Sequence, residues 1–167
     1  MGRRHNLLFS KGFTILEALL LVTALAMLAG VLTPVLSSHE RAERDRERAA
    51  ALATLQQALE AWHADHGTYP STNGAWWGDA PRFGAMEDSG PRAWIPGLTP
   101  LYLERLPKDP DESLPRGDRG FLYRSDGQDY KLLLHKTPES YSPASPWYDP
   151  VRPTWAWQIS TPGALHW

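Results

Sequence analysis

One long apolar run dominates the first forty residues. Residues 13–36 are apolar or weakly polar, and Glu17 is the one charged side chain among them. The run has about 24 residues, and roughly 20 are enough for a helix to cross a bilayer. The residues before it carry basic side chains and no acid. The positive-inside rule therefore places the N-terminus in the cytoplasm and the chain after Ser37 outside it.

Helical patterning continues beyond the apolar run. Residues 37–66 are rich in alanine, and charges of opposite sign recur four residues apart, as in Glu40 and Arg44. Gly67 follows as the expected C-terminal cap, so we predict one helix from Phe13 to His66. Four apolar side chains share one face of its second half and predict a stripe buried against a small domain: Leu52, Leu55, Leu59 and Trp62.

The charged segment of this helix has balanced signs. Residues 39–48 read HERAERDRER and combine four arginines with four acids. Such a balance favours a solvated helix face over a nucleic-acid site. The net charge of −2 also argues against a general nucleic-acid binder, so we expect nucleic acid to be an unlikely partner. The chain has no cysteine, which excludes catalytic thiols, zinc–thiolate sites and disulfides.

Loop signals follow the helix. Residues 67–94 are rich in glycine, proline and polar side chains and predict a long loop. Residues 137–153 are rich in proline and predict a second irregular stretch. We expect the first loop to be pinned by three large rings, Trp76, Trp77 and Trp94.

Short strands are predicted between and after these loops. Residues 121–124 and 130–134 are apolar or aromatic and flank an Asp-Gly turn at Asp126 and Gly127, which predicts a β-hairpin. Residues 154–160 alternate enough to form a last strand. The predicted fold is α+β, with the long N-terminal helix packed on a small antiparallel sheet.

Known catalytic motifs are missing from the sequence. It contains no GxSxG, P-loop or HExxH pattern and no GxGxxG after a strand, so we predict that the chain is not an enzyme. The eight tryptophans have two interpretations. They fill a small core, or they are exposed and stack on sugar rings or bases, as in a membrane-anchored periplasmic binding module.

Metal binding is a further open point. Two carboxylates flank the hairpin turn, Asp126 and Asp129, and oxygen ligands of this kind suit calcium. Turn-forming and solubilising roles explain them equally well, as they explain the other nearby acids. His63 and His66 lie three residues apart with no evident third ligand, so we interpret them as surface histidines. The other acids around the hairpin are Asp109, Asp111, Glu112 and Asp118.

Glu17 is the most unusual residue of the apolar run. A carboxylate in hydrocarbon costs at least a few kcal/mol, so it needs a partner or a function. A cleaved signal peptide ending near residues 35–37 leaves Glu17 inside its core, and a plain signal anchor leaves it unexplained.

A family resemblance supplies a third interpretation. Lys11 and the sequence Gly12-Phe13-Thr14-Ile15-Leu16-Glu17 resemble the N-terminal signal of type IV prepilins and type II secretion pseudopilins. The resemblance implies cleavage between Gly12 and Phe13 by a prepilin peptidase and methylation of the new Phe13 amine. It also implies that Glu17 pairs with that amine on a neighbouring subunit and so sets their register. Both charges cost less together than alone in apolar surroundings.

The resemblance extends to about Leu134. The motif at 67–70 (Gly-Thr-Tyr-Pro), the motif at 106–110 (Leu-Pro-Lys-Asp-Pro) and the hairpin are arranged as in pseudopilins, including those of the G type. It implies a structural subunit of a type II secretion or type IV pilus system that polymerises through its N-terminal helix. The implied partners are other pilin-like subunits, the prepilin peptidase, the inner-membrane assembly platform and the membrane.

The same resemblance divides the chain into four parts. Residues 1–12 are the leader, 13–36 the transmembrane and assembly half of the helix, 37–66 its C-terminal half, and 67–167 the globular periplasmic domain. The implied location is the bacterial inner membrane, crossed once, with the N-terminus in the cytoplasm, and the filament after assembly.

Gly30 and Pro34 mark a weak point in the apolar half of the helix. Pro34 has no N–H to donate to the carbonyl of Gly30, and glycine is a poor helix former. A proline at this distance from the junction also recurs in the pilin family. We therefore predict a helix that is continuous or gently kinked in the monomer and loosens between these residues on assembly.

Overall fold

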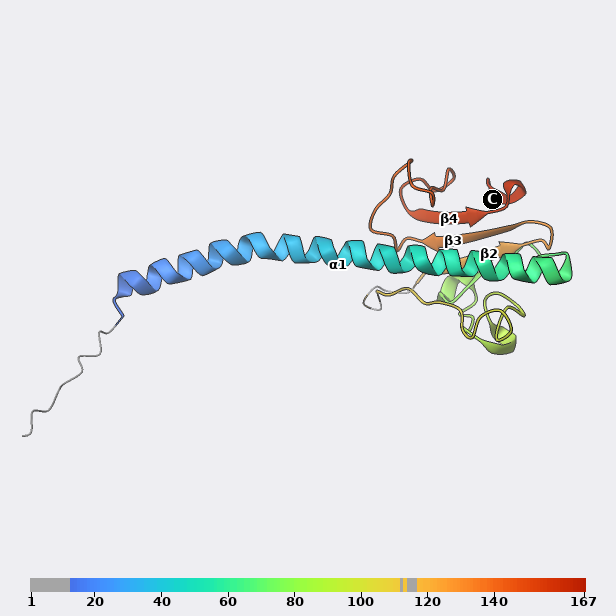
Figure 1. The fold of residues 1–167 in the computed structure, drawn as a ribbon, viewed down its shortest axis with the longest axis horizontal. Coiled ribbons are helices and arrows are strands. Elements are labelled where there is room, and N and C mark those ends of the chain that lie inside the picture. Colours follow the sequence, from blue (N-terminus) through green and yellow to red (C-terminus); the bar gives the residue numbers. More distant parts are fainter. Residues whose placement is uncertain (1–12, 112, 114–116) are drawn as a thin grey trace, which may run out of the picture. The chain divides into compact units, whose positions relative to one another are not determined.

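A computed structural model describes residues 13–111, 113 and 117–167 (Figure 1). The helix α1 covers Ile15–His66, and the strands are β1 (Trp77–Gly78), β2 (Gly120–Ser125), β3 (Tyr130–His135) and β4 (Ala156–Ser160). Three short 3-10 helices interrupt the loops: Pro81–Phe83, Gly90–Arg92 and Pro162–Ala164. One long helix and a small antiparallel sheet confirm the predicted α+β fold. The chain divides after Glu40 into two compact units.

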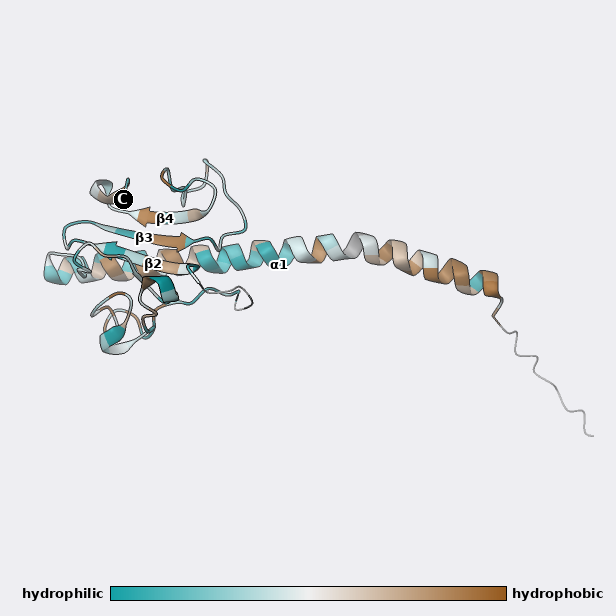
Figure 2. Cartoon of the chain, turned by 180° about the vertical axis from the view of Figure 1, so that it is seen from behind, coloured by the Kyte–Doolittle hydropathy of each residue, from teal (hydrophilic) through white to brown (hydrophobic). Residues whose placement is uncertain are grey.

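The first unit contains the apolar half of α1. Its side chains are exposed along the described part of the run, and Figure 2 shows this part of the ribbon in brown, for hydrophobic residues. The helix is long and apolar enough to cross a membrane. It begins at Ile15 and includes both Gly30 and Pro34 without interruption, as predicted for the monomer.

The second unit, residues 41–167, is built on a four-stranded sheet. Its strands lie in the order β1-β2-β3-β4, and every neighbouring pair is antiparallel. The predicted hairpin is confirmed, because β2 and β3 pair from Gly120 opposite His135 to Ser125 opposite Tyr130. This register leaves a four-residue turn, residues 126–129, around the predicted Asp-Gly pair. The predicted last strand is β4, which pairs with β3.

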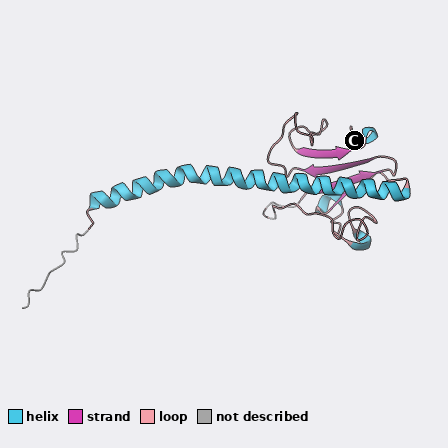
Figure 3. Ribbon diagram, in the orientation of Figure 1, coloured by secondary structure: helices cyan, strands magenta, loops and turns pink. Residues whose placement is uncertain are grey.

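The C-terminal part of α1 covers one face of this sheet (Figures 1 and 3). Leu52, Leu55 and Leu59 are fully buried in one cluster with inward-facing strand residues. Trp62 is only partly buried, which differs from the prediction that all four apolar residues are enclosed. Its ring packs against the loop instead, where Gly97 leaves room for it: a Cβ at Gly97 would lie 2.6 Å from the indole. The strand residues of the cluster are Phe121, Tyr123, Tyr130, Leu132, Leu134, Trp157 and Ile159.

The opposite face of the sheet carries a smaller apolar cluster. Leu122, Leu133 and Ala156 point away from α1 and are buried beneath Trp76 and Phe83, which come from the loop after the helix. This arrangement follows from strand alternation, since neighbouring residues of one strand face opposite sides. Both faces of the sheet are therefore covered, one by a helix and the other by loops.

Irregular chain makes up much of the rest of this unit, as Figure 3 shows. The predicted loop over residues 67–94 contains the two-residue strand β1 and two of the 3-10 helices. Residues 137–153 hold no helix or named strand, as predicted. Gly67 follows α1 with φ 71°, and its N–H bonds to the carbonyl of His63, which is the expected helix cap.

The prediction of a solvated face for residues 39–48 is wrong at two positions. Arg48 and Asp45 are buried, because a salt-bridge network joins α1 to two distant loops. The guanidinium of Arg48 makes two bonds to the carboxylate of Asp109, of 2.7 and 2.9 Å, and one of 3.1 Å to Asp45. Asp45 also accepts bonds from the backbone N–H of Glu139 and the hydroxyl of Ser140.

Burial alone lowers the pKa of Arg48, but the hydrogen bonds and charges of Asp109 and then Asp45 outweigh it and raise that pKa. Some charged side chains of this helix segment therefore form buried ion pairs, which the composition of the segment alone does not reveal. Asp109 comes from the Leu-Pro-Lys-Asp-Pro motif at 106–110.

Candidate functional site

Residues 13–36 form the first candidate site, an apolar surface that the rest of the described chain leaves open. Phe13 is 75% exposed and Ile15 is 90% exposed. The predicted cleavage point lies before Phe13, and its other residue, Gly12, is outside the described residues. A surface of this kind is stable in lipid or against other apolar helices, but not in water.

Glu17 lies in the first turn of α1 and bonds to Thr14. Its carboxylate accepts hydrogen bonds from the backbone N–H of Thr14, at 2.9 Å, and from the Thr14 hydroxyl, at 2.8 Å. The Thr14 hydroxyl in turn accepts a bond from the N–H of Glu17 at 3.2 Å. This reciprocal arrangement is a capping box. It holds the carboxylate at the N-terminal end of the helix.

The helix around Gly30 and Pro34 has polar side chains that bond to its own carbonyls. The Thr33 hydroxyl donates to the carbonyl of Ala29 at 2.6 Å, and the Ser37 hydroxyl donates to that of Pro34 at 3.0 Å. A Cβ added at Gly30 would meet no atom within 4 Å. The closed helix therefore tolerates a larger residue at this position in the monomer.

The two candidate calcium ligands take part in the hairpin turn. Asp126 accepts hydrogen bonds from the N–H groups of Gln128 and Asp129, both at 2.9 Å, and these bonds lower the pKa of the Asp126 carboxyl. Asp129 accepts a bond from the hydroxyl of Thr161. No group of three or more acidic or histidine side chains that could hold a metal occurs within the described residues.

The two histidines at the end of α1 have aromatic neighbours instead. The ring of His63 stacks on Tyr69 with centroids 4.5 Å apart, and that of His66 stacks on Trp62 at 4.0 Å. His66 is exposed, as predicted for a surface residue, whereas His63 is half-buried against Tyr69.

The tryptophans do not form a row of exposed rings. Trp94 and Trp157 are buried, and Trp155 is the most exposed of the eight tryptophans, at 38%. Arg152 lies between Trp76 and Trp155, with its guanidinium 5.5 and 5.9 Å from the two ring centroids. Stacking of sugars or bases needs free ring faces. The arrangement therefore favours the core-filling interpretation.

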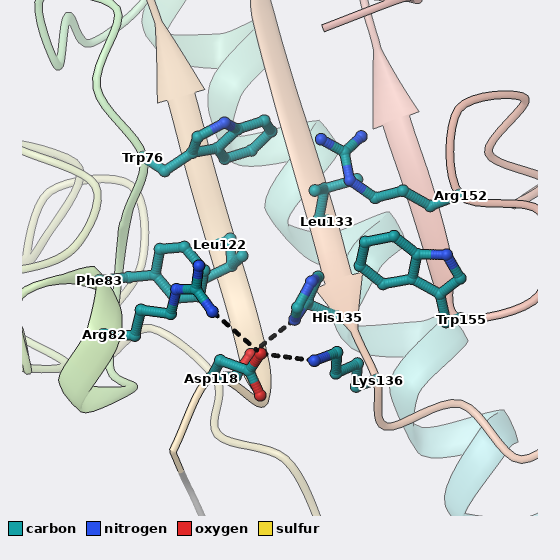
Figure 4. Close-up of a pocket in the computed structure, with 10 residues that line it drawn as sticks. All are labelled: Trp76, Arg82, Phe83, Asp118, Leu122, Leu133, His135, Lys136, Arg152 and Trp155. Carbon is teal, nitrogen blue, oxygen red and sulfur yellow. Dashed lines mark hydrogen bonds and ion pairs between the residues drawn. The ribbon is translucent and has the colours of Figure 1, made fainter.

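A pocket on the sheet face away from α1 was not predicted (Figure 4). Its volume is about 250 Å³, and its floor is formed by Leu122 and Leu133. The only sequence signal for it is weak: strand alternation places one leucine of β2 and one of β3 on this face, where they need a cover. The remaining lining residues come from three connections between elements and from the end of β3: Trp76, Arg82, Phe83, Asp118, His135, Lys136, Arg152 and Trp155.

Charged groups surround one side of this pocket. The Asp118 carboxylate pairs with Lys136 and, at 3.8 Å, with Arg82 (Figure 4). The hydrogen bond from Lys136 is the main cause of a lowered pKa at Asp118. Burial lowers the pKa of His135, whose Nδ1 lies 2.5 Å from the Asp118 carbonyl oxygen. The pocket thus combines an apolar floor with a fixed set of mostly basic side chains.

The comparisons with known proteins agree with the fold and the apolar segment. The chain is 29% identical over 126 residues to the type II secretion system core protein G of Vibrio cholerae, which covers 71% of this chain and 82% of that protein. It is 28% identical to the protein of that name from Aeromonas hydrophila, over 59% of this chain and 66% of the relative.

The Escherichia coli K12 protein of the same name is 26% identical over 60% of this chain and 66% of its own length. No family model and no solved structure matches. The shared name of these relatives confirms that the chain is similar to the type IV pilin and type II secretion pseudopilin family, and in particular to core protein G.

Proposed function

We propose that this chain is a structural pseudopilin subunit that polymerises through residues 13–36 into the filament of a type II secretion system. The observation that carries the proposal is the exposed apolar helix with Glu17 in its first turn. The relatives, all named as type II secretion core proteins, favour that system over a type IV pilus. Association of such helices removes their apolar side chains from lipid or water and packs them against one another.

Processing prepares the helix for this role. A prepilin peptidase cleaves between Gly12 and Phe13 and methylates the new Phe13 amine, which then lies at the membrane edge beside the capped end of α1. The subunit stays in the inner membrane with residues 37–167 in the periplasm until the assembly platform transfers it to the filament. Its other partners are further pilin-like subunits.

Glu17 exchanges its partner during assembly. In the monomer its carboxylate is bonded to Thr14, which reduces the cost of placing the charge near the lipid. In the filament the cationic amine of Phe13 on a neighbouring subunit approaches the same carboxylate. Two opposite charges compensate each other best where the surroundings are apolar, so the pair selects one register between helices.

The segment from Gly30 to Pro34 loosens in the filament. Lipid penalises an open backbone carbonyl, which keeps the helix closed in the membrane. Thr33 and Ser37 already bond to carbonyls beside the weak point, and packed neighbours offer further donors. The segment therefore opens at a lower cost after assembly than before it.

Replacement of Glu17 tests the proposal. Glu17→Ala, expressed with its secretion system and with wild-type subunits, is expected to insert into the membrane and to be processed. We expect its incorporation into filaments to fall at least ten-fold, since loss of about 1.4 kcal/mol per contact already gives that factor. The matched control is Glu47→Ala, which removes an exposed carboxylate from the same helix outside the apolar run.

Incorporation of Glu17→Ala at the wild-type level would contradict the assembly role. Loss of the Glu47→Ala variant from filaments to the same extent would contradict it too, because the effect would then not depend on the position of the charge.

A further inference from the structure

The pocket on the outer sheet face has the size of one or two side chains. Its volume of about 250 Å³ lies below the range of roughly 300–1,000 Å³ that holds drug-sized ligands. Leu122 and Leu133 lie at its base, where each is only 1% exposed, and the rings of Trp76 and Phe83 stand beside them as apolar walls (Figure 4). An aliphatic side chain therefore suits this space better than a polar ligand.

The walls of the pocket are held in place before anything binds. Arg152 bonds to Asp149 at 3.1 Å and to the backbone oxygen of Trp167 at 2.8 Å, and its guanidinium lies between Trp76 and Trp155. Asp149 is itself fully buried. A preformed pocket binds with little loss of side-chain freedom, which favours affinity.

The charge at the rim favours a carboxylate. Arg82 and Lys136 share the single carboxylate of Asp118, and both cations remain well exposed, at 72% and 40%. Arg152 adds a third positive charge that Asp149 compensates. The local excess of positive charge contrasts with the net charge of −2 of the whole chain.

A complementary feature occurs elsewhere on the same unit. Leu101 is 84% exposed, the largest exposed fraction given for a bulky hydrophobic residue in the second unit, and Pro100 beside it is exposed as well. Glu104, three residues further on, is exposed and makes no ion pair within the described residues. We call residues 100–104 the leucine tip. It offers an apolar side chain with a carboxylate nearby.

The leucine tip is anchored firmly to the end of α1. The hydroxyl of Tyr102 donates to Asp65 at 2.7 Å, and its ring lies 5.5 Å from that of Trp62. The N–H groups of Tyr102 and Leu103 both bond to the carbonyl of Leu98. This anchoring keeps Leu101 exposed to water. Its apolar surface contributes no burial free energy unless another molecule covers it.

The tip and the pocket of one copy cannot meet each other. The tip is fixed to α1, which covers one face of the sheet, whereas the pocket opens on the other face. A contact between them therefore joins two copies through different surfaces. Such heterologous contacts repeat from copy to copy and build helical filaments when they do not close into a ring.

We propose that the pocket receives Pro100 and Leu101 of a neighbouring copy of this chain, with Glu104 of that copy facing Arg82 and Lys136. The contact rests on the proposed function, since it joins globular domains of subunits whose helices already associate. It adds a second interface that fixes the rotation of each subunit relative to the next.

Cross-linking in filaments tests this contact, and the absence of native cysteine makes every introduced thiol informative. Leu101→Cys and Arg82→Cys are expressed as separate full-length copies in one cell with the secretion system. We expect oxidation to give a covalent dimer only when both copies are present. The control pairs Leu101→Cys with Gln128→Cys, an exposed position in the turn at the other end of the β2–β3 hairpin.

A substitution supplies a second measurement. Leu101→Asp places a charge on an exposed position, so the monomer is expected to fold normally, but the charge does not fit the apolar floor of the pocket. We expect about ten-fold fewer filaments in the sheared fraction, whereas Leu101→Met keeps the wild-type amount.

The outcomes separate this contact from the proposed function. If the wild-type chain forms no filaments, the proposed function fails and the contact fails with it. If filaments form but Leu101→Cys links to Gln128→Cys as readily as to Arg82→Cys, or to neither, the contact is refuted and the proposed function stands. If Arg82→Cys links instead to a different protein of the system, the pocket has another occupant and a second copy is excluded.

Discussion

Lys131 offers a sharp test of how the C-terminal tail is held. It lies on β3, and its side chain and that of Asp149 are both fully buried. The ammonium bonds to the Asp149 carboxylate at 3.1 Å and to the backbone oxygens of Leu165 and Trp167 at 2.8 and 3.3 Å. One buried cation therefore ties the loop over residues 137–153 and the end of the chain to the centre of the sheet.

Replacement of Lys131 by methionine keeps an unbranched side chain that is one heavy atom shorter and removes the charge. Breaking a buried ion pair costs roughly 3–5 kcal/mol, because the remaining charge is left without its partner. Arg152 still lies 3.1 Å from Asp149 in this variant and compensates part of that charge. We therefore expect the lower end, about 3 kcal/mol, which corresponds to a fall in melting temperature of about 10 °C for a folded region of this size.

Urea denaturation of the full chain in detergent, followed by tryptophan fluorescence, measures this change. Hydrogen exchange adds a local readout, since residues 162–167 are expected to lose protection in Lys131→Met. The control is Lys108→Met, which removes an exposed lysine paired with Asp88 and is expected to cost less than about 1 kcal/mol. Equal stability of the two variants, or unchanged protection of residues 162–167, would show that Lys131 does not hold the tail.

Three further predictions concern processing, packing and pH. Mass spectrometry of the mature protein is expected to show a chain that starts at Phe13 with a methylated amine, and a start near residue 38 would support a cleaved signal peptide instead. Gly97→Ala is expected to destabilise the protein by about 2 kcal/mol or more in urea titrations, because φ is +76° and the new Cβ meets the ring of Trp62. Burial and then the charge of Glu60 raise the pKa of Tyr69 to about 12. The folded state thus holds more protons than the unfolded state above about pH 10, so the free energy of unfolding falls between about pH 10 and 12, and Tyr69→Phe reduces that fall.

The elements of this fold that local sequence determines were predictable. The apolar run, the alanine-rich continuation and Gly67 define α1, and its observed end at His66 agrees with the prediction. The hairpin follows from two apolar runs around an Asp-Gly pair, although the register gives the turn four residues. Three of the four residues in the predicted stripe are buried, whereas Trp62 is partly buried and its ring packs over Gly97.

Contacts between distant segments were not predictable in the same way. The burial of Arg48 depends on Asp109, 61 residues further along the chain, and nothing near Arg48 in the sequence distinguishes it from exposed arginines of the same segment. The pocket likewise depends on how Trp76, Phe83 and Trp155 meet over two strands. Within the candidate assembly site, the pairing of Glu17 with Thr14 matches a local capping pattern, whereas its partner in a filament lies on another chain.

A structure of the assembled filament by electron cryomicroscopy tests the central proposal most directly. We predict that residues 13–36 of neighbouring copies pack together at the filament centre, with each Glu17 beside the Phe13 amine of another copy. We also predict that the leucine tip of one copy lies in the outer-face pocket of the next. Filaments that lack this chain, or that contain it with residues 13–36 at the periphery, would contradict assembly through the apolar helix.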